Sequence, residues 1–114
     1  MNDEDRKLAY ISQPMKGLTK DQIAEKRETL TALLADKGYD IIDTVFDDFD
    51  EKNEFSSPER KGLYFLGRAL SMMSTADIVV FCDGWEQQRG CSIEHDCAVK
   101  YGIPCFEEHQ LKDL

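Results

Sequence analysis

The sequence predicts a three-layer α/β fold, in which a parallel sheet of about four strands carries helices on both faces. Short apolar runs alternate four times with segments of helical periodicity along the 114 residues, and this alternation is typical of parallel sheets with right-handed crossovers. The clearest strand pattern, over 76–82, is an apolar run, as in strands that are covered on both faces. A chain of this length predicts a single domain over 1–114.

The first part of the chain predicts a strand, a helix and a second strand. An apolar run over 8–12 precedes a loop with proline and glycine. Thr19–Gln22 has the form of a capping box, and Gly38 supplies the end of the helix that follows. Only Arg27 interrupts the apolar stripe of this helix. The β-branched and aromatic residues of 39–46 predict the second strand.

The remainder predicts two more helix–strand pairs around an acidic connection. An exposed loop is expected over 47–57, although a lid over a site is an alternative. Ser57 and Pro58 are suited to the start of a helix. The other expected elements are a helix to about 74 with Leu63, Leu66, Leu70 and Met73 inward, a strand over 76–82, a helix over about 90–101, a strand over 103–106 and a frayed tail over 107–114.

These elements predict a sheet of the Rossmann or flavodoxin type with the strand order 2-1-3-4. Ligands of such sheets bind beyond the carboxyl ends of the strands, where the strand order reverses. We therefore expect a crevice between the first and third strands, bordered by residues 12–17 and 83–94.

The composition narrows the classes of partner. Lys and Arg total 14 and Asp and Glu total 23, which gives a net charge of −9 and a pI of about 4.6. This charge repels nucleic acid. No apolar run reaches the roughly 18 residues of a membrane span. The N-terminus lacks the basic and apolar regions of a secretory signal, so we expect a cytoplasmic protein.

The cysteines do not predict a metal site. Cys82, Cys91, Cys97 and Cys105 form no C-x-x-C pair, and no zinc spacing includes His95 or His109. We expect free, mostly buried thiols, and neither a metal nor a cofactor.

Glu94 is the residue that the helical pattern does not explain. At about 100° per residue, the apolar residues of the helix over 90–101, with the exception of Val99, fall on an arc of roughly 200° to 360°. Glu94 falls near 300°, inside this arc. The members of the arc are Cys91, Ile93, Cys97, Ala98 and Tyr101. The sequence therefore places a carboxylate on the face of the helix that meets the sheet.

An inward carboxylate at this position has a functional and a structural interpretation. Burial raises its pKa, and the nearby helix N-terminus is expected to lower it. The result would be an ionised, poorly solvated group that can act as a nucleophile or base. Alternatively, Glu94 makes a structural salt bridge with Lys16, Arg68 or Arg89, or lies in water at the helix end.

Several neighbours have equally open roles. Asp83–Gly84 is a common turn, and Arg89, Gly90 and Ser92 could either hold a phosphate or cap the helix. Trp85 could stack on a base or cover the edge of the core. Tyr10 is interpreted as core more readily than as a ligand contact. His95 and Asp96 are assigned to the solvated face of the helix.

Together these positions resemble a known family. Residues 82–94 read CDGWEQQRGCSIE, which is similar to the region around the catalytic glutamate of nucleoside 2-deoxyribosyltransferases, D-G-x-x-x-D-S-G-T-A-x-E-[IL]-G-x-A. Asp83, Gly84, Gly90, Glu94 and Ala98 align without gaps. The segment YISQPM at 10–15 resembles the family's opening strand and nucleoside-binding loop. The resemblance extends to the related deoxynucleoside 5′-monophosphate N-glycosidases.

The resemblance implies a glycosyl-transfer mechanism and a set of binding residues. Glu94 would attack C1′ of a nucleoside or nucleotide and displace the base, with Asp83 helping to shape the pocket. Gly90 would allow the backbone to approach the sugar or phosphate. The family's sites are usually completed by a neighbouring subunit, which predicts a homo-oligomer. The implied substrate-binding residues are Tyr10, Ser12, Gln13, Met15, Gly17, Gly84, Trp85, Gln88, Arg89, Gly90 and Ser92.

Three departures from the family pattern keep other functions open. Gln88 and Ala69 stand where the family usually has acidic residues, and Asp96 replaces a glycine. Arg89 adds positive charge and favours a phosphorylated ligand. A nucleotide-binding module without turnover is therefore the alternative to an N-glycosidic-bond enzyme, and an interaction domain without a ligand is the third possibility.

Overall fold

Four parallel strands form one sheet in the order β2-β1-β3-β4, which confirms the predicted fold class. The computed structural model describes residues 6–42 and 58–114. The strands are β1 (Lys7–Ser12), β2 (Tyr39–Ile41), β3 (Ile78–Phe81) and β4 (Cys105–Glu107). The parallel register sets Ser12 beside Phe81, so β1 and β3 end together at the same edge of the sheet.

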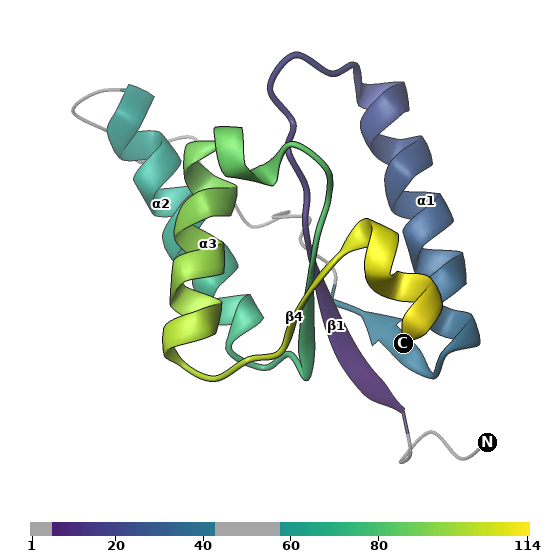
Figure 1. Cartoon of the computed structure of the whole chain (residues 1–114). Helices are drawn as coiled ribbons and strands as arrows, with labels where there is room; N and C mark the ends of the chain where they lie inside the picture. The colour runs from purple at the N-terminus through teal and green to yellow at the C-terminus, as the bar shows by residue number, and fades with distance from the viewer. Residues whose placement is uncertain (1–5, 43–57) are drawn as a thin grey trace.

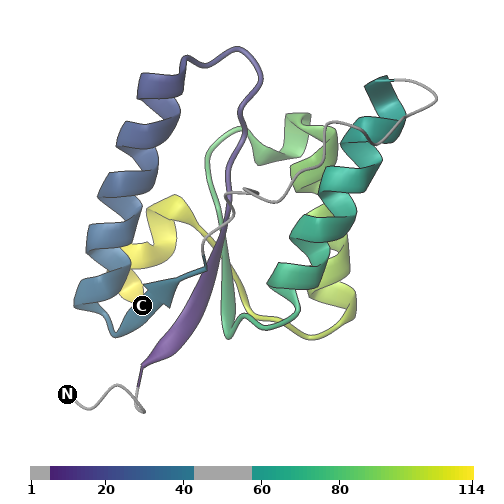
Figure 2. The same cartoon turned by 180° about the vertical axis from the view of Figure 1, so that it is seen from behind.

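Helices cover both faces of this sheet (Figures 1 and 2). α1 (Lys20–Asp36) and the short 3-10 helix η3 (Glu108–Asp113) lie on one face, and α2 (Pro58–Met73) and α3 (Arg89–Lys100) lie on the other. A second 3-10 helix, η2 (Trp85–Gln87), precedes α3. No helix within the described ranges is long and apolar enough to cross a bilayer.

The alternation of side chains along the strands divides the core in two. Ala9 and Ile11 of β1 pack against α1, whereas Tyr10 faces α2 and α3, because successive strand residues point to opposite faces. Ser12 shares the face of Tyr10 by the same periodicity. The α2–α3 side of β1 therefore ends in two hydroxyl groups.

Local signals explain where α1 begins and ends. The Thr19 hydroxyl accepts a hydrogen bond from the Gln22 N–H at 3.1 Å, and the Gln22 side chain accepts one from the Thr19 N–H at 2.9 Å. This reciprocal pair confirms the predicted capping box. Gly38 follows α1 with a φ of 91°, a conformation that favours glycine.

The inward position predicted for Leu63 needs correction. Leu63 is 62% exposed and does not point inward, because the first turns of α2 extend past the sheet (Figure 2). Met73, near the other end of α2, is buried as predicted. β2 ends at Ile41, and Ile42 follows it without strand structure. Residues 43–46 of the predicted strand, the predicted acidic loop over 47–57 and the predicted cap at Ser57 lie outside the described residues.

The C-terminal tail does not fray as predicted. Residues after β4 form η3, whose Leu111 is fully buried in the core beneath α1. The Glu107 N–H donates to the Gln110 side chain at 2.8 Å, and Lys26 pairs with Glu108 at 2.8 Å. The two leucines of this polar tail, Leu111 and Leu114, are too few to give a sustained periodic pattern, so the sequence did not indicate this docking.

The buried Leu111 predicts that the tail contributes to stability. We expect Leu111→Ala to lower the free energy of unfolding by about 2–4 kcal/mol, because it leaves a cavity in the core. Urea denaturation measures the change. Lys112→Ala, at an exposed neighbouring position, should change it by less than about 0.5 kcal/mol. Equal effects of the two substitutions would show that the tail is not docked.

Candidate active site

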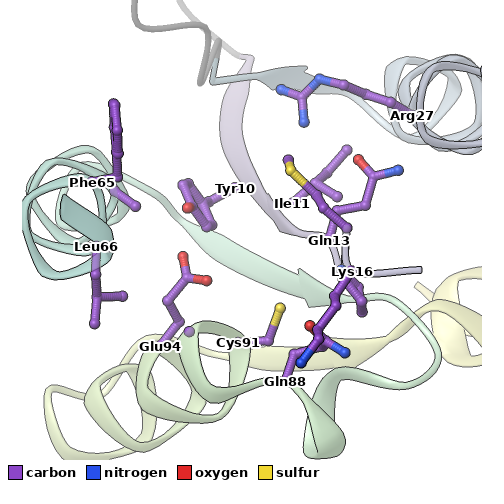
Figure 3. A pocket seen from close by; sticks show the side chains of 15 residues that line it. Tyr10, Ile11, Gln13, Lys16, Arg27, Phe65, Leu66, Gln88, Cys91 and Glu94 are labelled. Carbon is purple, nitrogen blue, oxygen red and sulfur yellow. The ribbon is translucent and has the colours of Figure 1, made fainter. Parts of the chain in front are cut away.

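A cavity of about 510 Å³ opens beside β1, between α2, the start of α3 and the loop after β1 (Figure 3). α1 also contributes one side chain, that of Arg27. The lining residues are Tyr10, Ile11, Gln13, Pro14, Met15, Lys16, Arg27, Gly62, Phe65, Leu66, Ala69, Gln88, Gly90, Cys91 and Glu94.

Glu94 is buried at the wall of this cavity. Glu94 is only 6% exposed, and its Oε1 accepts a hydrogen bond from the Ser12 hydroxyl at 3.0 Å. The second oxygen, Oε2, has no hydrogen-bond partner among the described residues. Across the same residues, Glu94 forms no ion pair with Lys16, Arg68 or Arg89. The structural alternatives, a salt bridge or a solvated helix end, are therefore not observed.

The position of Glu94 along α3 places its side chain on the buried face of the helix. Cys91, Glu94 and Ala98 are the buried residues of the helix, at the spacing of one helix face. The buried stripe is narrower than predicted, because Ile93 is 37% and Tyr101 85% exposed. Tyr101 is the C-cap and lies past the last helical turn. The inward position of Glu94 is nevertheless confirmed.

The surroundings of Glu94 oppose its negative charge. Burial raises the pKa of Glu94 above its ordinary value of 4.5, and the hydroxyl groups of Tyr10 and Ser12 counteract this rise. The helix N-terminus does not act as expected. Glu94 is the sixth residue of α3, and its hydrogen bond comes from Ser12 rather than from a backbone N–H. Hydroxyl groups from the sheet therefore solvate the carboxylate in place of the helix end.

Tyr10 lies close to the carboxylate, and its hydroxyl is directed toward Glu94 (Figure 3). It is 4% exposed, and burial together with the negative charge of Glu94 raises its pKa. The phenol consequently stays protonated at neutral pH. Its O–H group is available as a hydrogen-bond donor to the carboxylate or to a ligand.

The buried thiols of Cys82 and Cys91 do not compete with Glu94 as nucleophiles. Burial raises the pKa of Cys91, which lines the cavity, and raises the pKa of Cys82 to about 12. Both thiols are therefore protonated at neutral pH and unreactive. No cluster of metal-ligating side chains occurs within residues 6–42 and 58–114.

The structure brings together about half of the residues that the sequence singled out. Ser12 joins the site through its hydrogen bond to Glu94. The predicted residues that line the cavity itself are Tyr10, Gln13, Met15, Gln88, Gly90 and Glu94. The predicted residues that do not line it are Gly17, Asp83, Gly84, Trp85, Arg89 and Ser92.

Asp83 is misassigned by the sequence. It is exposed and borders a separate cavity of about 170 Å³ beside α1. Its backbone N–H donates to the Glu108 carboxylate at 2.7 Å. Gly84 follows with a φ of 90°, and this turn directs the chain away from the Glu94 cavity. Asp83 therefore anchors the loop to η3 and does not face the proposed substrate.

Trp85 covers the edge of the core, which was the alternative considered for it. Its ring stacks on His95 with centroids 4.2 Å apart and packs on Phe81 at 5.3 Å. The indole N–H donates to Glu107 at 3.1 Å. His95 is consequently half-buried in an aromatic cluster, and its assignment to the solvated face is wrong.

The other predicted residues that do not line the cavity either lie on another face of α3 than Glu94 or lie in a turn. Arg89 and Ser92 are exposed, because they point away from the buried stripe of α3. A guanidinium nitrogen of Arg89 lies 3.7 Å from the position that a Cβ on Gly62 would occupy, so Arg89 approaches α2. Gly17 has a φ of 84° and forms a turn before α1.

Sequence reasoning missed two walls of the cavity. The wall from α2 comprises Gly62, Phe65, Leu66 and Ala69, and its apolar residues are indistinguishable in sequence from core residues. The second missed contribution is Arg27 of α1, whereas Lys16 belongs to the segment 12–17 that was expected to border the crevice. Arg27 did carry a signal, because it interrupts an otherwise apolar stripe.

The family model described as Domain of unknown function (DUF4406) matches residues 7–106. The chain belongs to the DUF4406 family. The match runs from the start of β1 into β4, so every residue that lines the cavity lies within the DUF4406 domain. None of the curated proteins compared with the chain matches it.

The buried carboxylate of the DUF4406 domain predicts a gain in stability when it is neutralised. We expect Glu94→Gln to raise the free energy of unfolding at neutral pH by roughly 1 kcal/mol, because an amide avoids the burial of charge and keeps the Ser12 contact. Because the pKa of Glu94 is raised in the native state, the carboxylate becomes protonated as the pH falls, and its burial then costs less free energy. The advantage of Glu94→Gln should therefore shrink in acid.

Urea denaturation over a range of pH measures this effect. Glu86→Gln, at an exposed position of η2, is the matched control and should have little effect. A loss of stability in Glu94→Gln at neutral pH would contradict the account, because it would mean that the charge is compensated.

Proposed function

We propose that the protein cleaves or transfers the N-glycosidic bond of a nucleoside or nucleotide, with Glu94 as the nucleophile. The observation that carries this proposal is the buried Oε2 of Glu94, which has no partner among the described residues and belongs to a residue that lines a cavity. The similarity of residues 82–94 to the catalytic segment of nucleoside 2-deoxyribosyltransferases supports it.

The reaction proceeds in two displacements. Oε2 of Glu94 attacks C1′ of the sugar as the C1′–N bond breaks, and the base leaves with the bonding electron pair and takes a proton from solvent. Water then attacks C1′ and loses a proton, while the C1′–O bond breaks and its electrons return to Glu94. In transfer, a nitrogen of a second base replaces the water.

The environment of Glu94 suits this chemistry. The transition state carries positive charge on the sugar, as in retaining glycosidases, and a poorly solvated carboxylate stabilises such charge more strongly than one in water. Ser12 holds Oε1 at 3.0 Å, which leaves Oε2 for the attack. The cavity of about 510 Å³ is within the range of small-molecule sites, about 300–1,000 Å³.

A nucleotide-binding module without turnover is the second candidate. Gln88 and Ala69 both line the cavity, and they occupy the positions at which the resembled enzymes usually carry acidic residues. Without these acids, the cavity has fewer groups to orient a base and sugar for attack. This observation favours binding over catalysis.

The proposal predicts release of free base that depends on Glu94. A panel of nucleosides and nucleotides, in ribose and deoxyribose forms, is incubated with the protein and analysed by chromatography. Glu94→Gln and Glu94→Ala should lower the rate by at least about a thousandfold, because they remove the nucleophile. Asp96→Asn, which removes an exposed carboxylate from the same helix, should retain activity.

The outcomes separate the candidates. Exchange in the presence of a second base supports transfer, and free sugar or sugar phosphate supports hydrolysis. Binding by calorimetry without release supports the inactive module. The absence of both binding and release across the panel would leave the interaction domain.

Ser12 predicts a shift in the pH dependence of this activity. Glu94 must be ionised to attack, so kcat/KM falls as the pH drops through its pKa, which lies above 4.5. Ser12→Ala removes a hydrogen bond that favours the ionised form, and the acid limb should move to higher pH. Ser92→Ala, at an exposed position, should leave it unchanged. An acid limb that Ser12→Ala does not move would contradict the role of Ser12.

A further inference from the structure

Arg27 is a second polar side chain that the core pattern does not explain. It lies on α1 at a half-buried position and lines the same cavity as Glu94. Its guanidinium donates one hydrogen bond, at 3.0 Å, to the carbonyl of Ile42, which follows β2. This bond holds the side chain across the end of β2 and directs it toward the cavity (Figure 3).

The charge of Arg27 is uncompensated within residues 6–42 and 58–114. It forms no ion pair with a carboxylate of these residues, and its single bond to Ile42 leaves further N–H donors uncommitted there. A half-buried guanidinium costs free energy unless an acceptor satisfies it. Lys16, which also lines the cavity, pairs with no carboxylate of the same residues.

Among residues 6–42 and 58–114, cations outnumber carboxylates in the lining of the cavity. The chain has a net charge of −9, yet the described lining contains Lys16 and Arg27 against one carboxylate, Glu94. The net negative charge of the protein does not attract anions in general. An anionic group that binds here would therefore depend on these two cations, which are suited to recognise it specifically.

The apolar wall and the cationic wall lie on opposite sides of the cavity. In Figure 3, Phe65 and Leu66 of α2 stand on one side and Arg27 and Lys16 on the other. Tyr10 lies between, and both charges act on its hydroxyl: burial and Glu94 raise the pKa of Tyr10, and the positive charge of Arg27 lowers it. An aromatic base, a sugar and an anionic group can thus lie one after another across the cavity.

We infer that the ligand is a nucleoside monophosphate, whose phosphate Arg27 and Lys16 bind while Phe65 and Leu66 contact the base. This inference deepens the proposed function, on which its placement of the sugar at Glu94 rests. A phosphate carries about −1.5 to −2 charges at neutral pH, which matches two cations. The planar guanidinium of Arg27 is suited to phosphate oxygens.

Calorimetry on Glu94→Gln tests the inference in the absence of turnover. The probes are the deoxynucleosides, their 5′- and 3′-monophosphates, and inorganic phosphate. At least one monophosphate should bind about tenfold or more tightly than its nucleoside, since charge-assisted hydrogen bonds are lost without the phosphate. Inorganic phosphate alone should bind more weakly than this monophosphate.

A charge-matched pair of variants assigns the preference to Arg27. Adding Arg27→Met to the Glu94→Gln protein should weaken binding of the monophosphate about tenfold and leave the affinity for the nucleoside unchanged, so that the preference for the monophosphate is lost. Lys20→Met removes an exposed cation from the same helix, outside the cavity, and should leave the preference unchanged. If Arg27→Met does not fold, Lys16→Met and the phosphate preference of the parent protein provide the test.

Three results would overturn the inference: equal binding of nucleosides and monophosphates, binding of inorganic phosphate as tight as that of any nucleotide, or a preference that survives the loss of both cations. The proposed function is judged separately. A phosphate preference without base release supports the inference and rejects cleavage, whereas base release from nucleosides without a phosphate preference does the reverse.

Discussion

The burial of one carboxylate is the constraint on which the arrangement of the site depends. Glu94 lies on the face of α3 that meets the sheet, and a serine hydroxyl at the end of β1 satisfies only one of its oxygens within the described residues. A charge held in this way destabilises the empty protein. The same charge is poorly solvated and therefore stabilises positive charge that develops beside it. Stability given up at this position is consistent with a functional role.

The sheet order supplies the geometry for this carboxylate. Because β1 and β3 are parallel neighbours, the loop after β1 and the start of α3 meet at one edge. The periodicity of β1 places Tyr10 and Ser12 on the side of α3. Arg27, bonded to the carbonyl of Ile42 just after β2, lines the same cavity from the opposite layer. Two helices on different faces of the sheet thus contribute opposite charges to one site.

Sequence alone predicted the layers, the strand order and the inward direction of Glu94, because periodicity fixes which side of a regular element a residue occupies. It failed in the loop over 83–87, where the turn at Gly84 decides the direction of the chain and where Asp83 and Trp85 lie outside the cavity. It also failed for Leu111 and the wall from α2, because isolated or half-buried apolar residues give no distinctive pattern. The homo-oligomer and the cytoplasmic location stay predictions.

Trapping of the glycosyl-enzyme tests the central claim most directly. The protein is incubated with 2′-deoxy-2′-fluoroarabinonucleosides and their monophosphates, in which fluorine disfavours positive charge on the sugar and slows both displacements. Trypsin cuts after Arg89 and Lys100 and yields the peptide 90–100, which is analysed by mass spectrometry. The account predicts one fluoropentosyl group on Glu94 and none in Glu94→Gln. Release of base without an adduct, or an adduct on another residue such as Asp96, would contradict it.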